Sequence, residues 1–266
     1  MDFGLIIIGD EILSGKRADK HFGKIVELLG ARGLQLAWAS YLGDDRTRLV
    51  HKLRETFASG DAVFCCGGIG ATPDDHTRQS AAQALGVPLE LHPQAGALIA
   101  QRCAEMAREG HGSADMSTPE NRQRLKMGEF PVGSEIVPNP VNRIAGFSIR
   151  NHSFVPGFPA MAWPMIEWVL DHRYAHLHHQ EPRGERALLL FEVPESAATP
   201  LMEAVEAEFP GMKVFSLPSM GEDGQRRHIE LGVKGPLSML DEAWARLESG
   251  ARGLGGTVQP IGDPPS

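Results

Sequence analysis

Residues 62–77 read AVFCCGGIGATPDDHT, and this stretch decides the fold class. Its first five residues form an unbroken apolar run, which is typical of a strand buried on both faces of a parallel sheet. Two glycines end the run, and a helical pattern over about 77–85 begins directly after the loop. A buried strand, a glycine-rich loop and a helix in this order predict an α/β protein.

The segments before this stretch repeat the alternation. Apolar runs at 5–8 and 34–41 predict two more strands. We expect a helix between them, because apolar residues that should face the core recur at helical spacing: Phe22, Ile25, Val26 and Leu29. Strands of this kind that alternate with helices predict a mostly parallel sheet with helices on both faces.

The segments after it are less regular. Residues 110–140 are polar with scattered Gly and Pro, and they predict a long loop with a short helix near 121–126. Basic residues of this short helix, among them Arg122 and Arg124, could contact a phosphate or could be ordinary surface charges. A late hairpin over 144–155 and a helix over about 160–170 are expected to complete the domain.

A histidine-rich segment, residues 172–179, followed by Pro182-Arg183-Gly184, marks a change in composition. We therefore predict two domains, 1–171 and 182–266. The second has the predicted order strand 187–193, helix 199–209, strands 213–217 and 228–233, helix 237–247 and strand 257–261. This βαββαβ order predicts a small α+β domain of the ferredoxin-like type.

Composition limits the classes of function. The chain of 266 residues has 26 Lys and Arg against 34 Asp and Glu, a net charge of -8, which disfavours nucleic acid as a partner. Its 3 cysteines show no metal or disulfide spacing, so we expect reduced thiols. Its apolar runs are too short for a membrane span or a signal peptide. We expect a cytoplasmic protein with no membrane partner.

The loop in residues 67–77 combines two features that conflict unless a cation is present. Its glycines let a backbone approach a ligand closely, and the N-terminus of the following helix presents free N–H groups to an anion. Asp74 and Asp75 would repel a bare phosphate, whereas a divalent metal can bridge carboxylate and phosphate oxygens. The residues alone leave open the alternative that both aspartates only cap the helix.

Three other segments follow predicted strand ends: residues 9–16, 42–46 and 156–159. The first, GDEILSGK, is neither a phosphate-binding P-loop nor a dinucleotide fingerprint, because its spacing differs from both. In isolation, the second could be a helix N-cap and the third a turn that starts a helix. Since the carboxyl ends of parallel strands meet at one edge, we expect Glu11, Asp44, Asp74 and Asp75 to converge there.

Four motifs in this order and spacing resemble one known family. They are residues 9–15, residues 67–77, Asn142 with Gly146, and Pro156-Gly157-x-Pro159. Together they resemble the MoaB/Mog molybdopterin-binding domain family, and in particular the N-terminal domain of CinA-type (competence/damage-inducible) proteins. The resemblance covers roughly residues 1–170. About 95 residues follow, so we expect no C-terminal amidohydrolase of the CinA type.

The resemblance implies a three-layer α/β/α domain that forms dimers or trimers. It implies catalytic roles for Asp75 and Asp44, and a divalent metal, Mg²⁺ or similar, on Asp44, Asp74 and Asp75. The remaining residues that it implies bind a ligand are Gly9, Glu11, Ser14, Gly67, Gly68, Gly70, Thr72, Thr77, Asn142, Gly146, Pro156, Gly157 and Pro159. The ligand expected there is a phosphorylated pterin, such as molybdopterin, or a nucleotide.

Three functions remain open at this point. CinA-type domains are linked to metal-dependent hydrolysis of nucleotide pyrophosphates such as ADP-ribose, which is our leading expectation. Mog-type members adenylylate molybdopterin in molybdenum cofactor biosynthesis. A third possibility is a non-catalytic ligand sensor. The small second domain shows no Gly-x-x-Gly clamp followed by a basic helix, so RNA binding is not expected.

Overall fold

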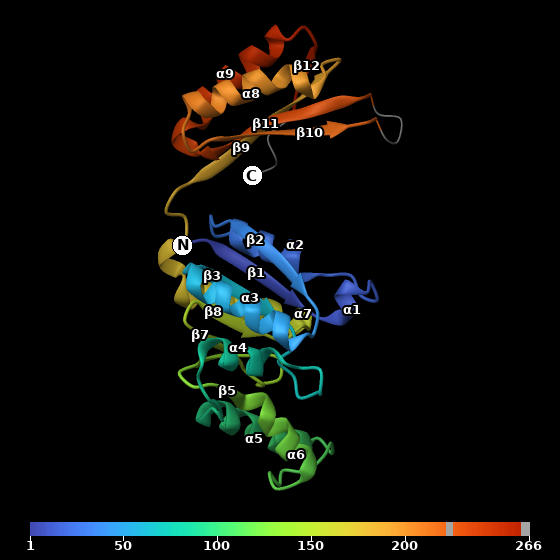
Figure 1. Cartoon of the computed structure of the whole chain (residues 1–266), viewed down its shortest axis with the longest axis vertical. Helices are drawn as coiled ribbons and strands as arrows, with labels where there is room; N and C mark the ends of the chain where they lie inside the picture. Colours follow the sequence, from blue (N-terminus) through green and yellow to red (C-terminus); the bar gives the residue numbers. More distant parts are fainter. Residues whose placement is uncertain (222–225, 262–266) are drawn as a thin grey trace. The chain divides into compact units, whose positions relative to one another are not determined.

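The computed structural model describes residues 1–221 and 226–261, and the chain divides into two compact units, Met1–His178 and His179–Ser266. The first unit contains a six-stranded sheet in the order β2-β1-β3-β8-β7-β6 (Figure 1). Its strands are β1 (Phe3–Ile8), β2 (Leu36–Leu42), β3 (Ala62–Cys66), β6 (Glu135–Val137), β7 (Gly146–Ile149) and β8 (His152–Val155). The first four positions of the sheet are parallel, and β7 and β6 add an antiparallel hairpin edge.

The helices of the first unit are α1 (Asp10–Leu13), α2 (His21–Gly30), α3 (Arg46–Ser59), α4 (Thr77–Leu85), α5 (Pro93–Arg108), α6 (Pro119–Leu125) and α7 (Pro159–Arg173), with the 3₁₀ turns η1 (Lys126–Gly128) and η2 (Ala175–Leu177). Of these, α2 and α7 pack on one face of the six-stranded sheet, and α3 and α4 pack on the other. A small antiparallel pair, β4 (Leu89–Leu91) with β5 (Glu129–Pro131), completes the unit. The expected α/β fold with a mostly parallel sheet is confirmed.

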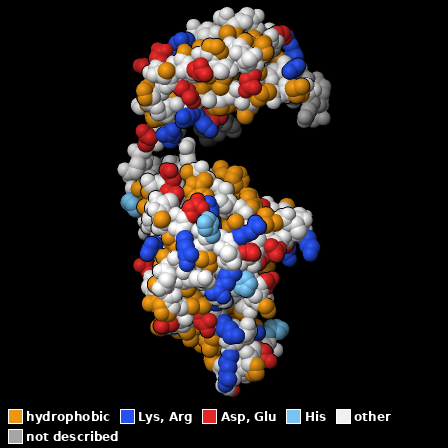
Figure 2. All heavy atoms as spheres, in the orientation of Figure 1, with side chains coloured by type: hydrophobic (Ala, Val, Ile, Leu, Met, Phe, Trp, Pro, Cys, Tyr) orange, Lys and Arg blue, Asp and Glu red, His pale blue; other side chains and the backbone are white. Residues whose placement is uncertain are grey.

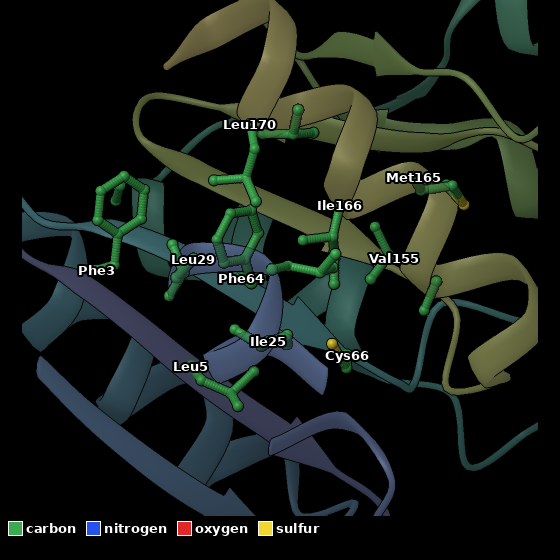
Figure 3. Packing of buried hydrophobic residues seen from close by; sticks show 14 of the residues in the cluster. Phe3, Leu5, Ile25, Leu29, Phe64, Cys66, Val155, Met165, Ile166 and Leu170 are labelled. Carbon is green, nitrogen blue, oxygen red and sulfur yellow. The ribbon is translucent and has the colours of Figure 1, made fainter. Parts of the chain in front are cut away.

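The core of the first unit forms two layers because alternate strand residues face opposite sides of the sheet. On one side, Leu5 and Phe64 pack against Ile25 of α2 and Ile166 of α7 (Figure 3). On the other side, the neighbouring strand residues Ile6 and Val63 pack with residues of α3, α4 and β7. This is the three-layer arrangement that the family resemblance implied.

Two local predictions for this unit need correction. Phe22 and Val26 were expected to face the core, but each is 44% exposed. The buried face of α2 is formed by His21, Ile25, Leu28 and Leu29, one step around the helix. The expected long loop at 110–140 also contains β5 and β6. These strands have three residues each, too short to produce a periodic pattern.

The second unit has the order β9 (Arg183–Phe191), α8 (Glu195–Glu208), β10 (Lys213–Ser219), β11 (His228–Pro236), α9 (Leu237–Gly253) and β12 (Thr257–Pro260). Its sheet is antiparallel throughout, in the order β10-β11-β9-β12. Leu188 and Leu190 of β9 pack against Val205 of α8 and Leu247 of α9. The expected small α+β domain is therefore present, with the strand order of a ferredoxin-like fold.

Charged side chains of both signs are interspersed over the face of the molecule seen in Figure 2. All three cysteines are free and buried. Among the helices of residues 1–221 and 226–261, none combines the length and the apolar character that a bilayer crossing needs.

Candidate functional site at the carboxyl edge of the sheet

The register of the parallel strands brings four loops to one edge. Ile8 pairs with Leu42, Ile7 pairs with Cys66, and Cys66 pairs with Val155. The carboxyl ends of β1, β2, β3 and β8 are therefore aligned, and the loops that leave them start side by side. Open α/β sheets bind their ligands at this edge.

Reciprocal hydrogen bonds join the loops after β1 and β2. The backbone N–H of Asp10 donates to Asp44 Oδ2 at 2.9 Å, and the N–H of Asp44 donates to Asp10 Oδ1 at 3.2 Å. Gly43 makes this contact possible, since a Cβ at that position would lie 2.3 Å from Asp10 Oδ1. Two carboxylates that are 34 residues apart in sequence are thus held next to each other.

The carboxylates at this edge repel one another. The pKa of Asp44 is raised, first by partial burial and then by the charges of Asp10, Glu11 and Asp74, while the hydrogen bond from Asp10 N–H opposes the shift. A like charge nearby disfavours the ionised form of a carboxyl group, and a bound cation would favour it. Asp10, Glu11 and Asp74 therefore lie near enough to act on the charge of Asp44, whereas Asp75, the fourth carboxylate expected to converge there, accepts hydrogen bonds from Thr72.

The glycine loop, defined as residues 67–72, is hydrogen-bonded to the first turn of α4. Gly67 and Gly68 have φ values of +113° and +66°, which favour glycine. Thr77 is fully buried, and its hydroxyl donates to Gly67 O at 3.0 Å while its N–H donates to Gly68 O at 3.0 Å. We predicted that Thr77 would bind a ligand, but the structure directs its polar atoms into the loop, which it supports.

Asp75 organises the far end of the glycine loop. Its Oδ2 accepts hydrogen bonds from the N–H of Thr72 at 2.9 Å and from the Thr72 hydroxyl at 2.5 Å. A Cβ on Gly70 would lie 2.4 Å from the same oxygen, so the loop closes tightly around this carboxylate. Asp74 is exposed, and hydrogen bonding within the loop lowers its pKa. The two adjacent aspartates therefore have different environments.

The fourth loop, Pro156–Pro159, packs against the glycine loop. Gly67 N–H donates to Val155 O at 3.0 Å, and a Cβ on Gly157 would lie 3.5 Å from Gly67 Cα. The buried side chain of His21 is hydrogen-bonded through Nε2 to Gly157 O at 3.0 Å. His21 was not predicted as a site residue, because only the tertiary fold brings the start of α2 to this loop.

The remaining predicted ligand-binding residues lie at or near the same edge. Gly146 begins β7, which runs antiparallel to β8, so it lies beside the carboxyl end of β8. It is buried there, and a Cβ would lie 2.3 Å from Phe154 O. Asn142 Oδ1 accepts a hydrogen bond from Ile144 N–H at 3.0 Å, which shapes the loop before β7. Ser14 is exposed and lines an open hollow of about 470 Å³ together with Asp10, Glu11, Leu13 and Lys16.

The carboxylates at this edge suit a divalent metal ion that takes only one or two ligands from the protein. Within the described ranges, no three His, Cys, Asp or Glu side chains are placed to hold a single ion, so Asp44, Asp74 and Asp75 form no ready three-ligand set. Mg²⁺ commonly takes one or two carboxylates and completes its coordination with water and phosphate oxygens. The crowded carboxylate of Asp44 suits that mode, in which the ligand's phosphate supplies the remaining oxygens.

Substitution of Gly67 by Ala tests whether the edge depends on this loop geometry. A Cβ at Gly67 would lie 2.2 Å from Ile8 O, at a φ that side chains rarely adopt. We expect Gly67→Ala to lower the free energy of unfolding by about 2–4 kcal/mol. Gly60, whose φ is +81° with open space around its Cβ position, provides the control. Urea unfolding should show a clearly smaller loss for Gly60→Ala, and equal losses would contradict this account of the loop.

Fold and site together define an α/β protein whose glycine loop and carboxylates meet at the carboxyl edge of the parallel strands. The family model described as "Probable molybdopterin binding domain" matches residues 4–176. The chain belongs to this family.

Relatives agree with that assignment, and a solved structure is similar in fold. The chain is 32% identical to a CinA-like protein of Anaeromyxobacter sp. (strain Fw109-5) over 87% of its own length, and 29% identical to a CinA-like protein of Escherichia coli O17:K52:H18 over 90%. It spans 58% of the length of each. The crystal structure of the protein CinA with unknown function from Thermoplasma acidophilum is similar in fold, with a TM-score of 0.54 and 24% identity, covering 64% of this chain and 98% of that one.

Proposed function

We propose that the first unit binds a nucleotide pyrophosphate of the ADP-ribose type and hydrolyses it with the help of a divalent metal ion. The observation that carries this proposal is that a loop suited to an anion and a carboxylate suited to a cation lie at the same edge of the sheet. A glycine loop at the start of α4 suits phosphate oxygens, and beside it the carboxylate of Asp44 has a raised pKa because it is partly buried and other carboxylates lie near it. A metal–phosphate ligand satisfies both.

In this proposal the chain's residues have separate tasks. Backbone N–H groups between residues 68 and 71 of the glycine loop bind and orient one phosphate, and Asp75 keeps that loop closed through Thr72. Asp44 and Asp74 hold the metal, and Asp10 fixes Asp44 through their reciprocal hydrogen bonds. The metal, when bound, neutralises charge that develops on the phosphate oxygens. Water attacks one phosphorus, the bond between that phosphorus and the bridging oxygen breaks, and two phosphomonoesters are released.

A coupled assay tests the proposal directly. ADP-ribose, NAD and FAD are incubated with the protein and Mg²⁺, Mn²⁺, Co²⁺ or Ni²⁺, and an added phosphatase then liberates phosphate from any new monoester. We expect phosphate release from ADP-ribose that requires the metal and stops when EDTA is added. If the folded protein releases no phosphate from any of the three compounds with any of the metals, the proposal is wrong.

The family description favours a second candidate, which is adenylyl transfer to molybdopterin. The same edge would then bind the pterin phosphate, and an adenylyl group from ATP would be transferred to that phosphate with release of pyrophosphate. Growth of a strain that lacks molybdopterin adenylylation, restored by this chain, would support the transferase. Metal-dependent ADP-ribose hydrolysis without such restoration would support the hydrolase.

A further inference from the structure

Arg78 connects the glycine loop to a distant part of the first unit. It lies in the first turn of α4 and is only 2% exposed. One terminal nitrogen, Nη2, donates to Gly70 O at 2.5 Å. The other, Nη1, donates to Lys126 O and lies 3.5 Å from Glu129 O. One buried guanidinium therefore joins the glycine loop to η1 and the start of β5.

Burying a charged arginine costs desolvation free energy, so its presence calls for a task that an apolar side chain could not perform. Burial lowers the pKa of Arg78, although the carboxylates of Glu129 and Asp75 oppose that shift. An apolar side chain of similar volume would avoid this desolvation. What it could not do is hold two backbone segments at a set spacing, which the planar guanidinium does with donors that point in different directions.

Gln123 reaches the same loop from α6. Its Nε2 donates to Ala71 O at 2.7 Å. The carbonyls of two consecutive loop residues, Gly70 and Ala71, are thus held by side chains from two different helices. Because a trans peptide is planar, holding a carbonyl also fixes the direction of the next N–H group. Arg78 therefore orients Ala71 N–H, and Gln123 orients Thr72 N–H, which donates to Asp75.

The segment that carries Gln123 has an anchor of its own. Thr118 caps α6 through Asn121 N–H, and the buried Asn121 side chain donates to Ser113 O at 2.8 Å and to Asp115 O at 2.9 Å. Arg124, which we considered as a phosphate contact, bonds to Asn121 Oδ1 at 2.6 Å instead. Hydrogen bonds therefore fix α6 to residues 113–115, and α6 in turn contacts the glycine loop through Gln123.

We propose that Arg78 and Gln123 are positioning residues for the glycine loop, and that residues 119–129 belong through them to the ligand-binding apparatus. The ligand part of this inference rests on the proposed function, because it takes the glycine loop as the phosphate site. The positioning part concerns the loop itself. Loosening the Arg78 contact lets the Gly70–Ala71 peptide plane turn, so that Ala71 N–H no longer points toward a phosphate. Loosening the Gln123 contact weakens the bond from Thr72 N–H to Asp75 that closes the loop.

Hydrogen exchange of the ligand-free, full-length protein tests the positioning part. In Gln123→Ala, amide exchange at residues 69–72 should be about five- to tenfold faster than in the parent chain, the effect of losing one hydrogen bond. Glu120→Ala is the matched control, since Glu120 is exposed on the same short helix. It should leave exchange in the loop unchanged. Equal exchange in Gln123→Ala and Glu120→Ala would overturn the inference.

Arg78→Lys separates positioning from simple stability. Lysine keeps the charge but lacks the second donor arm, so it can hold one segment and not both. We expect faster exchange at residues 69–72 and a several-fold higher KM for ADP-ribose with kcat changed less. If Arg78→Lys lowers the melting temperature while exchange in the loop changes no more than elsewhere, its role is structural only, and the inference fails for Arg78. Faster loop exchange in a chain that binds no ADP-ribose would support positioning and refute the proposed ligand.

Discussion

Asp44→Asn is expected to lower metal-dependent turnover of ADP-ribose by about 10²-fold or more, without loss of stability. The first effect follows from the proposed function, because the carboxylate that holds the metal is removed and the metal supplies several kcal/mol of charge stabilisation in such reactions. Initial rates over a range of Mg²⁺ concentrations measure it. Asn can still accept the hydrogen bond from Asp10 N–H, so the loop geometry is kept.

The stability of Asp44→Asn distinguishes loss of function from loss of fold. A carboxyl group whose pKa is raised on folding makes its stabilising contribution at low pH, and this is lost as the pH rises through the folded value. At pH 7 the charge of Asp44 is thus unfavourable in the folded state, since burial and the nearby Asp10, Glu11 and Asp74 all disfavour it. We expect the urea midpoint of Asp44→Asn at pH 7 to equal or exceed that of the parent chain.

The neighbouring Asp45 provides the control for this substitution. Asp45 caps α3 by accepting a hydrogen bond from Arg48 N–H at 2.8 Å, and Asn caps helices about equally well. Asp45→Asn should therefore retain full turnover. Asp75→Asn should lose less turnover than Asp44→Asn, because its amide oxygen can still accept from Thr72 and close the loop. Unchanged turnover in Asp44→Asn would refute the assignment of Asp44 to the metal–phosphate site.

His152 is expected to make the first unit sensitive to acid. It is 1% exposed at the start of β8, its Nε2 is hydrogen-bonded to Thr56 Oγ1 at 2.8 Å, and its ring packs against Phe57 with centroids 4.2 Å apart. Burial, opposed in part by Asp61, lowers the pKa of His152 to about 3. The neutral ring is the form that the folded chain accommodates.

The sign of the pH effect follows from proton binding. Between pH 6.5 and about 3 the unfolded chain protonates this histidine and the folded chain does not. The stabilising contribution of neutral His152 is therefore complete above pH 6.5 and is lost as the pH falls toward 3. By pH 5 the loss amounts to roughly 2 kcal/mol of unfolding free energy.

Urea unfolding of the parent chain and of His152→Gln at pH 7.5 and pH 5.0 measures this contribution. Gln can still bond to Thr56 but does not titrate. The parent chain should lose about 2 kcal/mol more than His152→Gln over this interval, because all other titrating groups are common to both. Equal losses in the two proteins would show that His152 titrates normally in the folded chain.

Much of the architecture could be predicted from local patterns. Buried runs such as residues 5–8 and 62–66 identify strands of a parallel sheet, because only a strand covered on both faces tolerates an unbroken apolar sequence. The three-residue strands β4, β5 and β6 could not be predicted in this way. They are stabilised by pairing with partners distant in sequence, for example Glu90 with Phe130, rather than by any period of their own.

The candidate site likewise has parts that local sequence patterns reveal and parts that only the tertiary fold brings together. The glycine loop, the aspartates of residues 74–75 and the Gly9–Glu11 segment are recognisable from residue types and spacing. The supports of the loop are not. Arg78 meets Lys126 O across 48 residues, Gln123 meets Ala71 O across 52, and His21 meets Gly157 O across 136. No local pattern distinguishes these three from ordinary surface or core residues.

The amino-acid sequence by itself determined the order of the longer strands and helices, the break between two domains, and the four segments that follow strand ends. These depend on periodicity and turn chemistry, which act between residues a few positions apart. The tertiary structure alone decided that Asp10 and Asp44 hold each other, that Thr77 and Arg78 donate hydrogen bonds to carbonyls of the glycine loop, and that the pKa of Asp44 is raised. Burial and Coulomb interactions depend on distance in space, and only the folded sheet sets those distances.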